Sequence, residues 1–289
     1  MDPSDCEKKV ESDWRIIAIN INNFPTEKNG IDKAKYDLLK KTITDSDADI
    51  VGISELGRNE DNIPFHLRPS NVIKKWVERG TAKSAWNRRN TLSKYEPGGV
   101  LLSTRDKSTA HVVKKGNDNR NLGRWTWITL KGKQNLHTTV ITIYRPTNHQ
   151  VTAQNQLGAI RKINCIKQPE DFWSEDLSTL IQRKKEIGGV LVMGDFNDDL
   201  NNHEGKINTY FQQLGLREVL NEKYGDGPPT HSFGSTKIDG IYATAELSIR
   251  QGGYGGTQLS PSDHLYPWVD IEAKDIVGLE RDDRLKKGI

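Results

Sequence analysis

The chain has 289 residues, of which 42 are basic and 39 acidic, and hydrophobic residues make up 34%. This mild excess of positive charge permits a polyanionic partner without requiring one. A run of about 18 apolar residues is missing, which excludes a membrane span, and no charged-then-apolar leader indicates secretion. The two cysteines, Cys6 and Cys165, favour a reducing compartment over a disulfide framework. We therefore expect an intracellular protein that folds as one large domain or two small ones.

The first half of the chain alternates between strand and helix patterns. Residues 14–21 predict a strand, because isoleucines alternate there with smaller or polar residues. A helix is expected over residues 31–43 and a short buried strand over 50–53. Residues 58–97 lack a clear period and predict a short helix mixed with loop.

The second half predicts more strands and three further amphipathic segments. We expect strands over 98–103, 125–130, 138–144, 190–193, 238–244 and 268–271, and helices over most of 148–187, interrupted near Pro169, and over 207–214. Adjacent alternating strands indicate antiparallel pairing. The expected fold is a single α/β domain over 14–271, with two packed, mostly antiparallel sheets flanked by helices. Residues 1–13 predict a flexible arm, and 272–289 a charged tail that frays.

Polar residues follow several of these strands. The apolar run 190–193 ends in Gly194-Asp195-Phe196-Asn197, so a carboxylate and a carboxamide project together from a strand end. Such a pair suits metal-assisted attack on a phosphate, with the carboxylate acting as base or as ligand. Other strand ends carry Asn20 and Asn22, Glu55, Tyr144-Arg145, and Ser262-Asp263-His264.

Asp239 stands among apolar neighbours in the strand over 238–244. Burying an unpaired carboxylate costs several kcal/mol, so it needs a partner. His264 is the best candidate among seven histidines, because Asp263 adjoins it. Each of these features has an ordinary structural explanation by itself: Asp263 could cap a helix, Tyr144 could pack in a sheet, and Glu55 could be a solvated turn residue. Their combination and their order along the chain favour a functional site.

In that order, the motifs resemble the endonuclease/exonuclease/phosphatase superfamily, whose fold is deoxyribonuclease-I-like. The resemblance runs from residue 14 to 271, and its most specific marks are Gly-Asp-Phe-Asn at 194–197 and Ser-Asp-His at 262–264. It implies a four-layer α/β sandwich in which two packed sheets are flanked by helices.

The resemblance also implies roles for individual residues. Glu55 would be the main Mg²⁺ ligand, helped by Asn20 and Asp263, and Mn²⁺ could substitute. His264 would donate to a phosphate oxygen while Asp239 holds its ring. Asp195 would deprotonate the attacking water. Four residues complete the implied set: Asn197 would orient the phosphate or Asp195, Tyr144 would contact the phosphate, and Asn22 and Arg145 would lie on the substrate side.

The branch of the superfamily is less sharply defined. Inositol-polyphosphate phosphatases carry a Trp-Cys-Asp-Arg strand where this chain has Lys237-Ile238-Asp239-Gly240. Abasic-site endonucleases carry an aspartate at the position of Asn22 and a glutamine at that of Ser54. Deadenylases share only the surroundings of Asp263. Residues 98–103 and 144–146 look most like the endonuclease domains of retrotransposon-type reverse transcriptases, which nick DNA to leave a 3′-hydroxyl and a 5′-phosphate.

Basic side chains in the predicted loops are compatible with DNA as the partner. Arg88 and Arg89 lie beside Trp86, and phosphate contacts with aromatic stacking are typical of nucleic-acid surfaces. Further basic residues are Lys83, Lys94, Arg120, Arg124, Lys131 and Lys133. We expect a monomer, with the nucleus as one candidate location. A repair nuclease of the abasic-site or exonuclease-III type is the next candidate. A phosphatase acting on soluble phosphoesters, a deadenylase and a nucleic-acid-binding module without chemistry are the further alternatives.

Overall fold

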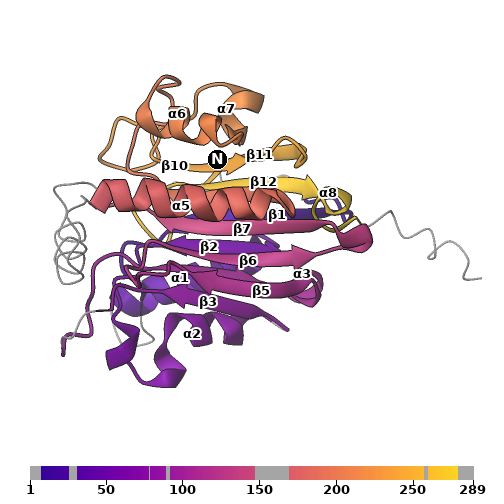
Figure 1. Cartoon of the computed structure of the whole chain (residues 1–289). Helices are drawn as coiled ribbons and strands as arrows, with labels where there is room; N and C mark the ends of the chain where they lie inside the picture. Colours follow the sequence, from indigo (N-terminus) through magenta and orange to yellow (C-terminus); the bar gives the residue numbers. More distant parts are fainter. Residues whose placement is uncertain are drawn as a thin grey trace, which may run out of the picture.

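Two six-stranded sheets form the centre of the molecule (Figure 1). The computed structural model describes residues 8–25, 31–77, 79–88, 92–146, 169–256 and 260–278. The first sheet has the order β11-β12-β1-β2-β4-β3 and the second β5-β6-β7-β8-β10-β9. The strands of the first sheet are β1 (Asp13–Asn20), β2 (Ile50–Ser54), β3 (Thr81–Ala85), β4 (Val100–Thr104), β11 (Ile249–Gly255) and β12 (Tyr266–Glu272). Those of the second are β5 (Val112–Asn117), β6 (Trp125–Lys131), β7 (His137–Tyr144), β8 (Gly188–Asp195), β9 (Arg217–Glu218) and β10 (Asp239–Ala243).

Helices cover the outer faces of both sheets. The α-helices are α1 (Ile31–Asp45), α2 (Pro69–Trp76), α3 (Asp106–Ala110), α5 (Pro169–Lys185), α6 (Lys206–Gln213), α7 (Val219–Tyr224) and α8 (Ala273–Val277). Short 3₁₀ helices are η2 (Glu60–Asn62), η3 (Phe65–Leu67) and η4 (Lys133–Asn135). In Figure 1, α5 lies across the sheet that contains β7. Among the helices of the described residues, none has the length and apolar composition that crossing a membrane requires.

The alternation of β1 explains the four layers. Ile16 belongs to the core between the sheets, whereas Ile17 and Ile19 pack outward against the side chains of α1 and α2. In the second sheet, Val190 and Val192 similarly face outward toward α5 and α6. Because both faces of these central strands are buried, the chain forms a helix, sheet, sheet, helix sandwich. The predicted fold class is confirmed.

Each sheet contains one parallel pair at its centre, β1 with β2 and β7 with β8, and its other pairings are antiparallel. A parallel pair places two carboxyl ends at the same edge of a sheet. The two sheets therefore bring the ends of β1, β2, β7 and β8 together, and this is where the polar motifs of the sequence follow the strands.

Two expectations about the elements need correction, and the described residues bear out part of a third. Residues 58–97 contain the strand β3, which pairs with β4. The strand β5 was not predicted, because its sequence Val-Val-Lys-Lys-Gly-Asn does not alternate and its edge position leaves it largely exposed. The helix expected over 148–187 is described from residue 169 to 185, and residues 147–168 lie outside the described part of the chain.

The ends of the predicted domain also differ from expectation. Lys9 lies within the segment predicted as a flexible arm, yet its Nζ atom is 2.8 Å from Oδ2 of Asp49. At the other end, the charged segment from residue 272 forms α8, where Ile276 and Val277 are fully buried in the core between the sheets. Because this segment is rich in charged residues, its two consecutive apolar residues were not predicted to lie in the core.

Candidate active site

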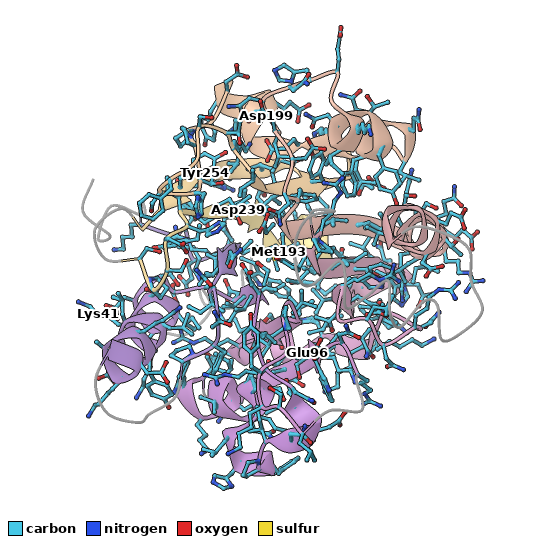
Figure 2. The ribbon with its side chains drawn as sticks, turned by 90° about the vertical axis from the view of Figure 1, so that its left-hand side faces the viewer. Lys41, Glu96, Met193, Asp199, Asp239 and Tyr254 are labelled. Atoms are coloured by element: carbon cyan, nitrogen blue, oxygen red, sulfur yellow. The ribbon has the colours of Figure 1, made fainter. Side chains whose placement is uncertain are left out.

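Strand register places the polar motif residues side by side at one end of the sandwich. In the second sheet, Asp195 at the end of β8 is the register partner of Tyr144 on β7 and of Asp239 on β10. In the first sheet, Asn20 is paired with Ser54, which immediately precedes Glu55. Figure 2 looks at the molecule from the left-hand side of Figure 1, with Asp239 near the centre of the view. Both sheets thus contribute side chains to one cluster.

The turn after β8 fixes the direction of the Asp195 carboxylate. Gly194 has φ +138°, and a Cβ atom there would lie 2.2 Å from the carbonyl oxygen of Ile143 on β7. The backbone N–H of Asn197 donates to Oδ1 of Asp195 at 2.8 Å, and its side-chain Nδ2 donates to Oδ2 at 3.2 Å. Asn197 itself has φ +47°, a conformation that asparagine tolerates better than most residues. The Gly-Asp-Phe-Asn motif is thus a tight turn that holds one carboxylate.

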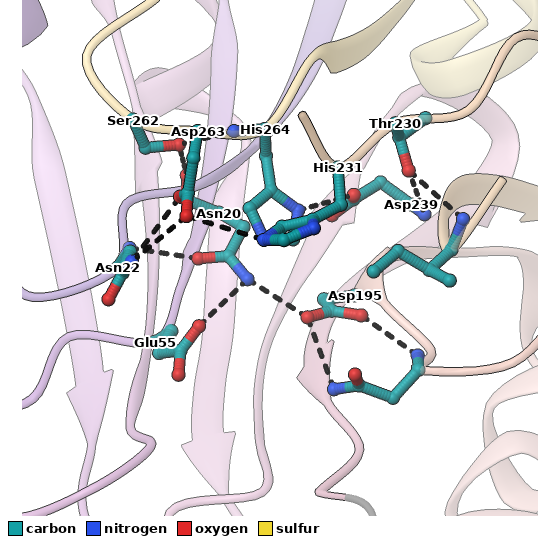
Figure 3. Close-up of polar contacts among 12 residues, drawn as sticks. Asn20, Asn22, Glu55, Asp195, Thr230, His231, Asp239, Ser262, Asp263 and His264 are labelled. Carbon is teal, nitrogen blue, oxygen red and sulfur yellow. Dashed lines mark hydrogen bonds and ion pairs between the residues drawn. The ribbon is translucent and has the colours of Figure 1, made fainter. Parts of the chain in front are cut away.

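Asn20 bridges the two sheets at the site (Figure 3). Its Nδ2 atom donates to Oε2 of Glu55 at 3.0 Å and to Oδ2 of Asp195 at 2.9 Å. Glu55 has φ +58°, which is unusual for a residue of its size, and its Oε1 accepts a hydrogen bond from the hydroxyl of Tyr144 at 3.2 Å. The buried Tyr144 therefore contacts the glutamate, and the structure places Asn20, Glu55, Tyr144 and Asp195 in one hydrogen-bonded chain.

Asp239 and His264 form a buried pair on the other side of Asp195. Nδ1 of His264 lies 2.8 Å from Oδ2 of Asp239, and both side chains are less than 10% exposed. The hydroxyl of Thr230 accepts hydrogen bonds from the backbone N–H groups of Ile238 and Asp239, which fixes the start of β10. The pairing predicted from the sequence is present, and it leaves Nε2 of His264 as the free ring nitrogen of this pair.

The surroundings of His264 and Asp195 shift the pKa values of both groups. Burial lowers the pKa of His264, but the hydrogen bond to Asp239 and the charges of Asp239, Asp195 and Asp263 outweigh it and raise the pKa to about 9. Burial, followed by the neighbouring charge of Asp239, raises the pKa of Asp195 well above its usual range, although His264 opposes this. His264 is therefore a cation at neutral pH, while Asp195 is a more basic carboxylate than one in water.

Asp263 is surrounded by donors. Nδ2 of Asn22 lies 3.3 and 3.2 Å from its two carboxylate oxygens, and Nε2 of His231 lies 3.3 Å from Oδ2. Burial raises the pKa of Asp263, but the bond from Asn22 and the charges of His264 and His231 outweigh this, so the pKa falls below its usual range. Asp263 is therefore ionised at neutral pH, which a metal ligand requires.

The donor set fits a hard divalent cation. Ligand atoms of Glu55, Asp195 and His264 all lie within 4.8 Å of one another, and Asp263 forms a second such group with His264 and His231. Glu55 and Asp263 offer carboxylate oxygens, which Mg²⁺ and Mn²⁺ prefer. The Oδ1 atom of Asn20 accepts the backbone N–H of Asn22 at 2.9 Å and retains a second lone pair. These oxygens could hold the cation that the sequence predicts.

Of the arginines predicted to bind the substrate, the two that the structure describes contact other groups of the protein. Nη1 of Arg145 donates to the backbone carbonyls of Phe196 and Asn197 at 3.2 and 3.1 Å, so this guanidinium supports the turn after β8. Arg88 lies over the ring of Trp86, 4.9 Å from its centroid. Arg89 lies outside the described residues.

One member of the predicted basic surface belongs instead to the interior. Arg124 is completely buried, with its guanidinium over the Trp125 ring and Nη2 3.1 Å from Asp176. Its guanidinium is therefore paired with Asp176 inside the protein and is not presented to a substrate. Loop position alone, the basis of the sequence prediction, does not reveal which way an arginine faces.

Two contributors were missed in the sequence. His231 forms an isolated bridge with His264, and their rings are 4.9 Å apart. The hydroxyl of Ser262 donates to the backbone carbonyl of Asn20, which ties the Ser-Asp-His segment to the end of β1. His231 follows two prolines in an irregular stretch, where only its residue type marked it as a candidate. Ser262 was part of a recognised motif, but its partner is 242 positions away in sequence.

Comparison with known proteins agrees with this geometry. A sequence profile described as the endonuclease/exonuclease/phosphatase family matches residues 17–264. The matched range includes the residues of the cluster, from Asn20 to His264. A sequence comparison with curated proteins gave no match.

Solved structures share the fold at low sequence identity. An endonuclease/exonuclease/phosphatase family protein from Leptotrichia buccalis is 18% identical, with a TM-score of 0.63 over 90% of this chain and 99% of that one. The catalytic domain of Xenopus laevis APE2 is 15% identical, with a TM-score of 0.61 over 90% and 92% of the two chains. The human Nocturnin catalytic domain is 16% identical, with a TM-score of 0.62 over 94% and 99%. At such identities, the likeness shows the shared fold.

Proposed function

The chain belongs to the endonuclease/exonuclease/phosphatase family, and we propose that it is a divalent-metal-dependent endonuclease that hydrolyses DNA phosphodiester bonds. The observation that carries the proposal is the hydrogen-bonded chain from Glu55 through Asn20 to Asp195, which faces the buried Asp239–His264 pair. This cluster combines oxygen atoms that suit a hard metal ion, a carboxylate of raised pKa and the protonated imidazole of His264. These are the groups that phosphodiester hydrolysis needs.

In the proposed reaction, Asp195 accepts the proton of the attacking water. Its two hydrogen bonds from Asn197 and one from Asn20 fix the carboxylate, and its raised pKa favours proton uptake. His264, protonated at neutral pH, donates from Nε2 to a non-bridging phosphate oxygen. Asp239 holds the imidazole and stabilises its charge. The bond between the phosphorus and the 3′-oxygen on its opposite side breaks. The departing 3′-oxygen takes a proton from solvent water to give the 3′-hydroxyl, and the phosphate stays on the 5′ end.

Glu55, Asp263 and Asn20 would hold the divalent cation, Mg²⁺ with Mn²⁺ as a substitute. When bound, the cation neutralises the negative charge that develops on the phosphate oxygens. The hydrogen bonds from Tyr144 and Asn20 orient the Glu55 carboxylate for this role. Asn22 does the same for Asp263.

Within the family, the motifs at residues 98–103 and 144–146 favour the retrotransposon-type endonuclease domains as the nearest branch. A repair nuclease acting at abasic sites is the next candidate. Either would cut within a polymer and leave the phosphate esterified to the nucleic acid, whereas a phosphatase would release inorganic phosphate.

Oligonucleotide substrates with mapped product ends test the proposal. We expect intact duplex DNA to be nicked in Mg²⁺ to give 3′-hydroxyl and 5′-phosphate ends. Parallel reactions on abasic duplex, single-stranded DNA, polyadenylate and inositol phosphates identify the branch. Glu55→Gln should raise the Mg²⁺ concentration needed for half-maximal cleavage, whereas the control Glu222→Gln, at an exposed site paired with Arg217, should not. Release of phosphate from inositol phosphates without cleavage of any nucleic acid would contradict the proposal, as would DNA binding without cleavage in any metal.

A further inference from the structure

Phe233 differs from the phenylalanine side chains of the core clusters in being almost fully exposed. Its side chain is 90% exposed, whereas Phe24, Phe196 and Phe211 are each at most 2% exposed and belong to the core clusters. An aromatic ring in water contributes little to the folded state, and burying it on binding would be favourable. Single exposed apolar residues are common, so the position of Phe233 must decide whether it has a role.

The turn that carries Phe233 is firmly attached to the site. Residues 231–234 form a four-residue turn closed by the N–H of Gly234 donating to the carbonyl of His231 at 2.9 Å. The backbone N–H and the hydroxyl of Ser232 both donate to the carbonyl oxygen of Asp263, at 2.8 and 2.7 Å. The N–H of Leu265 donates to the carbonyl of Thr230 at 2.7 Å. The chain therefore holds Phe233 in place through the segment that carries Asp263 and His264.

The ring of Phe233 is separated from the reacting groups by one imidazole. Its centroid is 5.9 Å from that of His231 in an edge-to-face arrangement. The His231 ring in turn lies 4.9 Å from the ring of His264, and its Nε2 lies 3.3 Å from the carboxylate of Asp263. Figure 3 shows His231 beside both residues. Phe233 thus stands at the rim of the site, beyond the groups that would hold the phosphate.

In a nucleotide, one sugar lies between the phosphate and the base. In the protein, the His231 ring similarly lies between the groups that would hold the phosphate and Phe233. We infer that Phe233 is a specificity-determining residue, on whose ring a base next to the scissile phosphate stacks. The inference rests on the proposed function and narrows it: the substrate carries an unpaired or displaced base beside the cut, rather than a soluble phosphoester without an aromatic group. Stacking on one aromatic face tolerates every base, so this contact selects nucleic acid without selecting a sequence.

Two single-stranded oligomers of equal length and charge test the inference: oligothymidylate, and the same backbone with tetrahydrofuran in place of every nucleoside. Cleavage is measured in Mg²⁺ and binding by fluorescence anisotropy in Ca²⁺. We expect the wild type to prefer the base-bearing oligomer by about tenfold or more, as expected for one stacked base. Phe233→Ala should lose this preference by losing affinity for oligothymidylate alone, and Phe233→Trp should retain it. Phe65→Ala, a control in η3 at a side chain 72% exposed, should also retain it.

The outcomes separate this inference from the proposed function. If the wild type cleaves both oligomers equally, or if Phe233→Ala weakens both to the same extent or neither, the stacking role is wrong while the nuclease assignment stands. If the wild type neither binds nor cleaves either oligomer and also leaves duplex DNA intact, the proposed function itself is wrong. Retention of the preference by Phe233→Trp and its loss in Phe233→Ala would support stacking over a purely structural effect.

Discussion

Nδ1 of His264 lies 2.8 Å from Oδ2 of Asp239, and this buried contact joins the segment that leads into β12 of one sheet to a strand of the other. Asp239 is on β10, while His264 precedes β12. The pair therefore depends on the packing of the two sheets, and it supplies the site with a cation that stays charged at neutral pH. Several measurable consequences follow from this arrangement.

Replacing Asp239 by asparagine should lower the pKa of His264 from about 9 toward its ordinary value, because the variant removes the negative charge and leaves only a neutral amide oxygen as acceptor. Cleavage at pH 8 should fall by about 10²-fold or more, as for loss of a positioned catalytic proton donor. The imidazole titration followed by NMR checks the cause. The control is Asp226→Asn, which removes a carboxylate from the exposed His203 pair. An unchanged His264 titration in Asp239→Asn would refute the role given to Asp239.

The stability of the protein should depend on pH through His264. Its pKa is about 9 in the folded protein and 6.5 in its ordinary state. Because the folded pKa is raised, the contribution is fully present below about pH 6.5 and is lost as the pH rises through about 9, and it amounts to about 3 kcal/mol. Urea unfolding at a series of pH values measures this slope. His264→Gln should flatten the curve between these pH values, and an unchanged curve would show that the histidine is not protonated as described.

Gly194→Ala should destabilise the protein and disturb the site, because the new Cβ would lie 2.2 Å from a backbone carbonyl oxygen of β7. Gly225 provides a matched control, since it has φ +79° but no atom within 4 Å of a Cβ. We expect Gly225→Ala to cost about 1 kcal/mol from backbone strain alone. The free energy of unfolding should fall by clearly more in Gly194→Ala. Equal losses in the two variants would show that the close contact with β7 has no effect.

Lys237 should be needed for stability. Its Nζ is completely buried, 2.8 Å from Oε2 of Glu218 and 2.6 Å from Oδ1 of Asn221. Lys237→Met leaves Glu218 buried without its countercharge, which should cost about 3–5 kcal/mol. The double variant Lys237→Met with Glu218→Gln should recover part of this loss. Lys274→Met, which removes an exposed partner of Glu272, should change the free energy of unfolding far less, because water already solvates that pair. Equal effects of the two lysine variants would contradict this account.

The sequence predicted the features that depend on local pattern. The strand β8 was visible as an apolar run and β1 as alternating isoleucines, although alternation alone does not show that both faces of β1 are buried. The residues after each strand were recognised as one family pattern. The pairing of Asp239 with His264 was also predicted, since a buried carboxylate requires a partner.

Other features depend on contacts between distant parts of the chain. Asn20 was expected as a ligand, but its bonds to Glu55 and Asp195 appear only when the two sheets pack. The burial of Arg124 depends on Asp176 from α5, which is 52 positions away. His231 lies in an irregular turn and has no period to mark it. The edge strands β5 and β11 carry basic residues and glycines and owe their structure to a neighbouring strand.

The most direct test is nicking of supercoiled plasmid DNA by the purified protein in Mg²⁺, with EDTA as the blank and Asp195→Asn beside the control Asp226→Asn. The wild type and the control should convert the plasmid to open circles at the same rate, EDTA should stop the reaction, and Asp195→Asn should be slower by about 10²-fold or more. Nicking that persists in EDTA, or that is equal in Asp195→Asn and the wild type, would contradict the assignment of this cluster as the active site of a metal-dependent endonuclease.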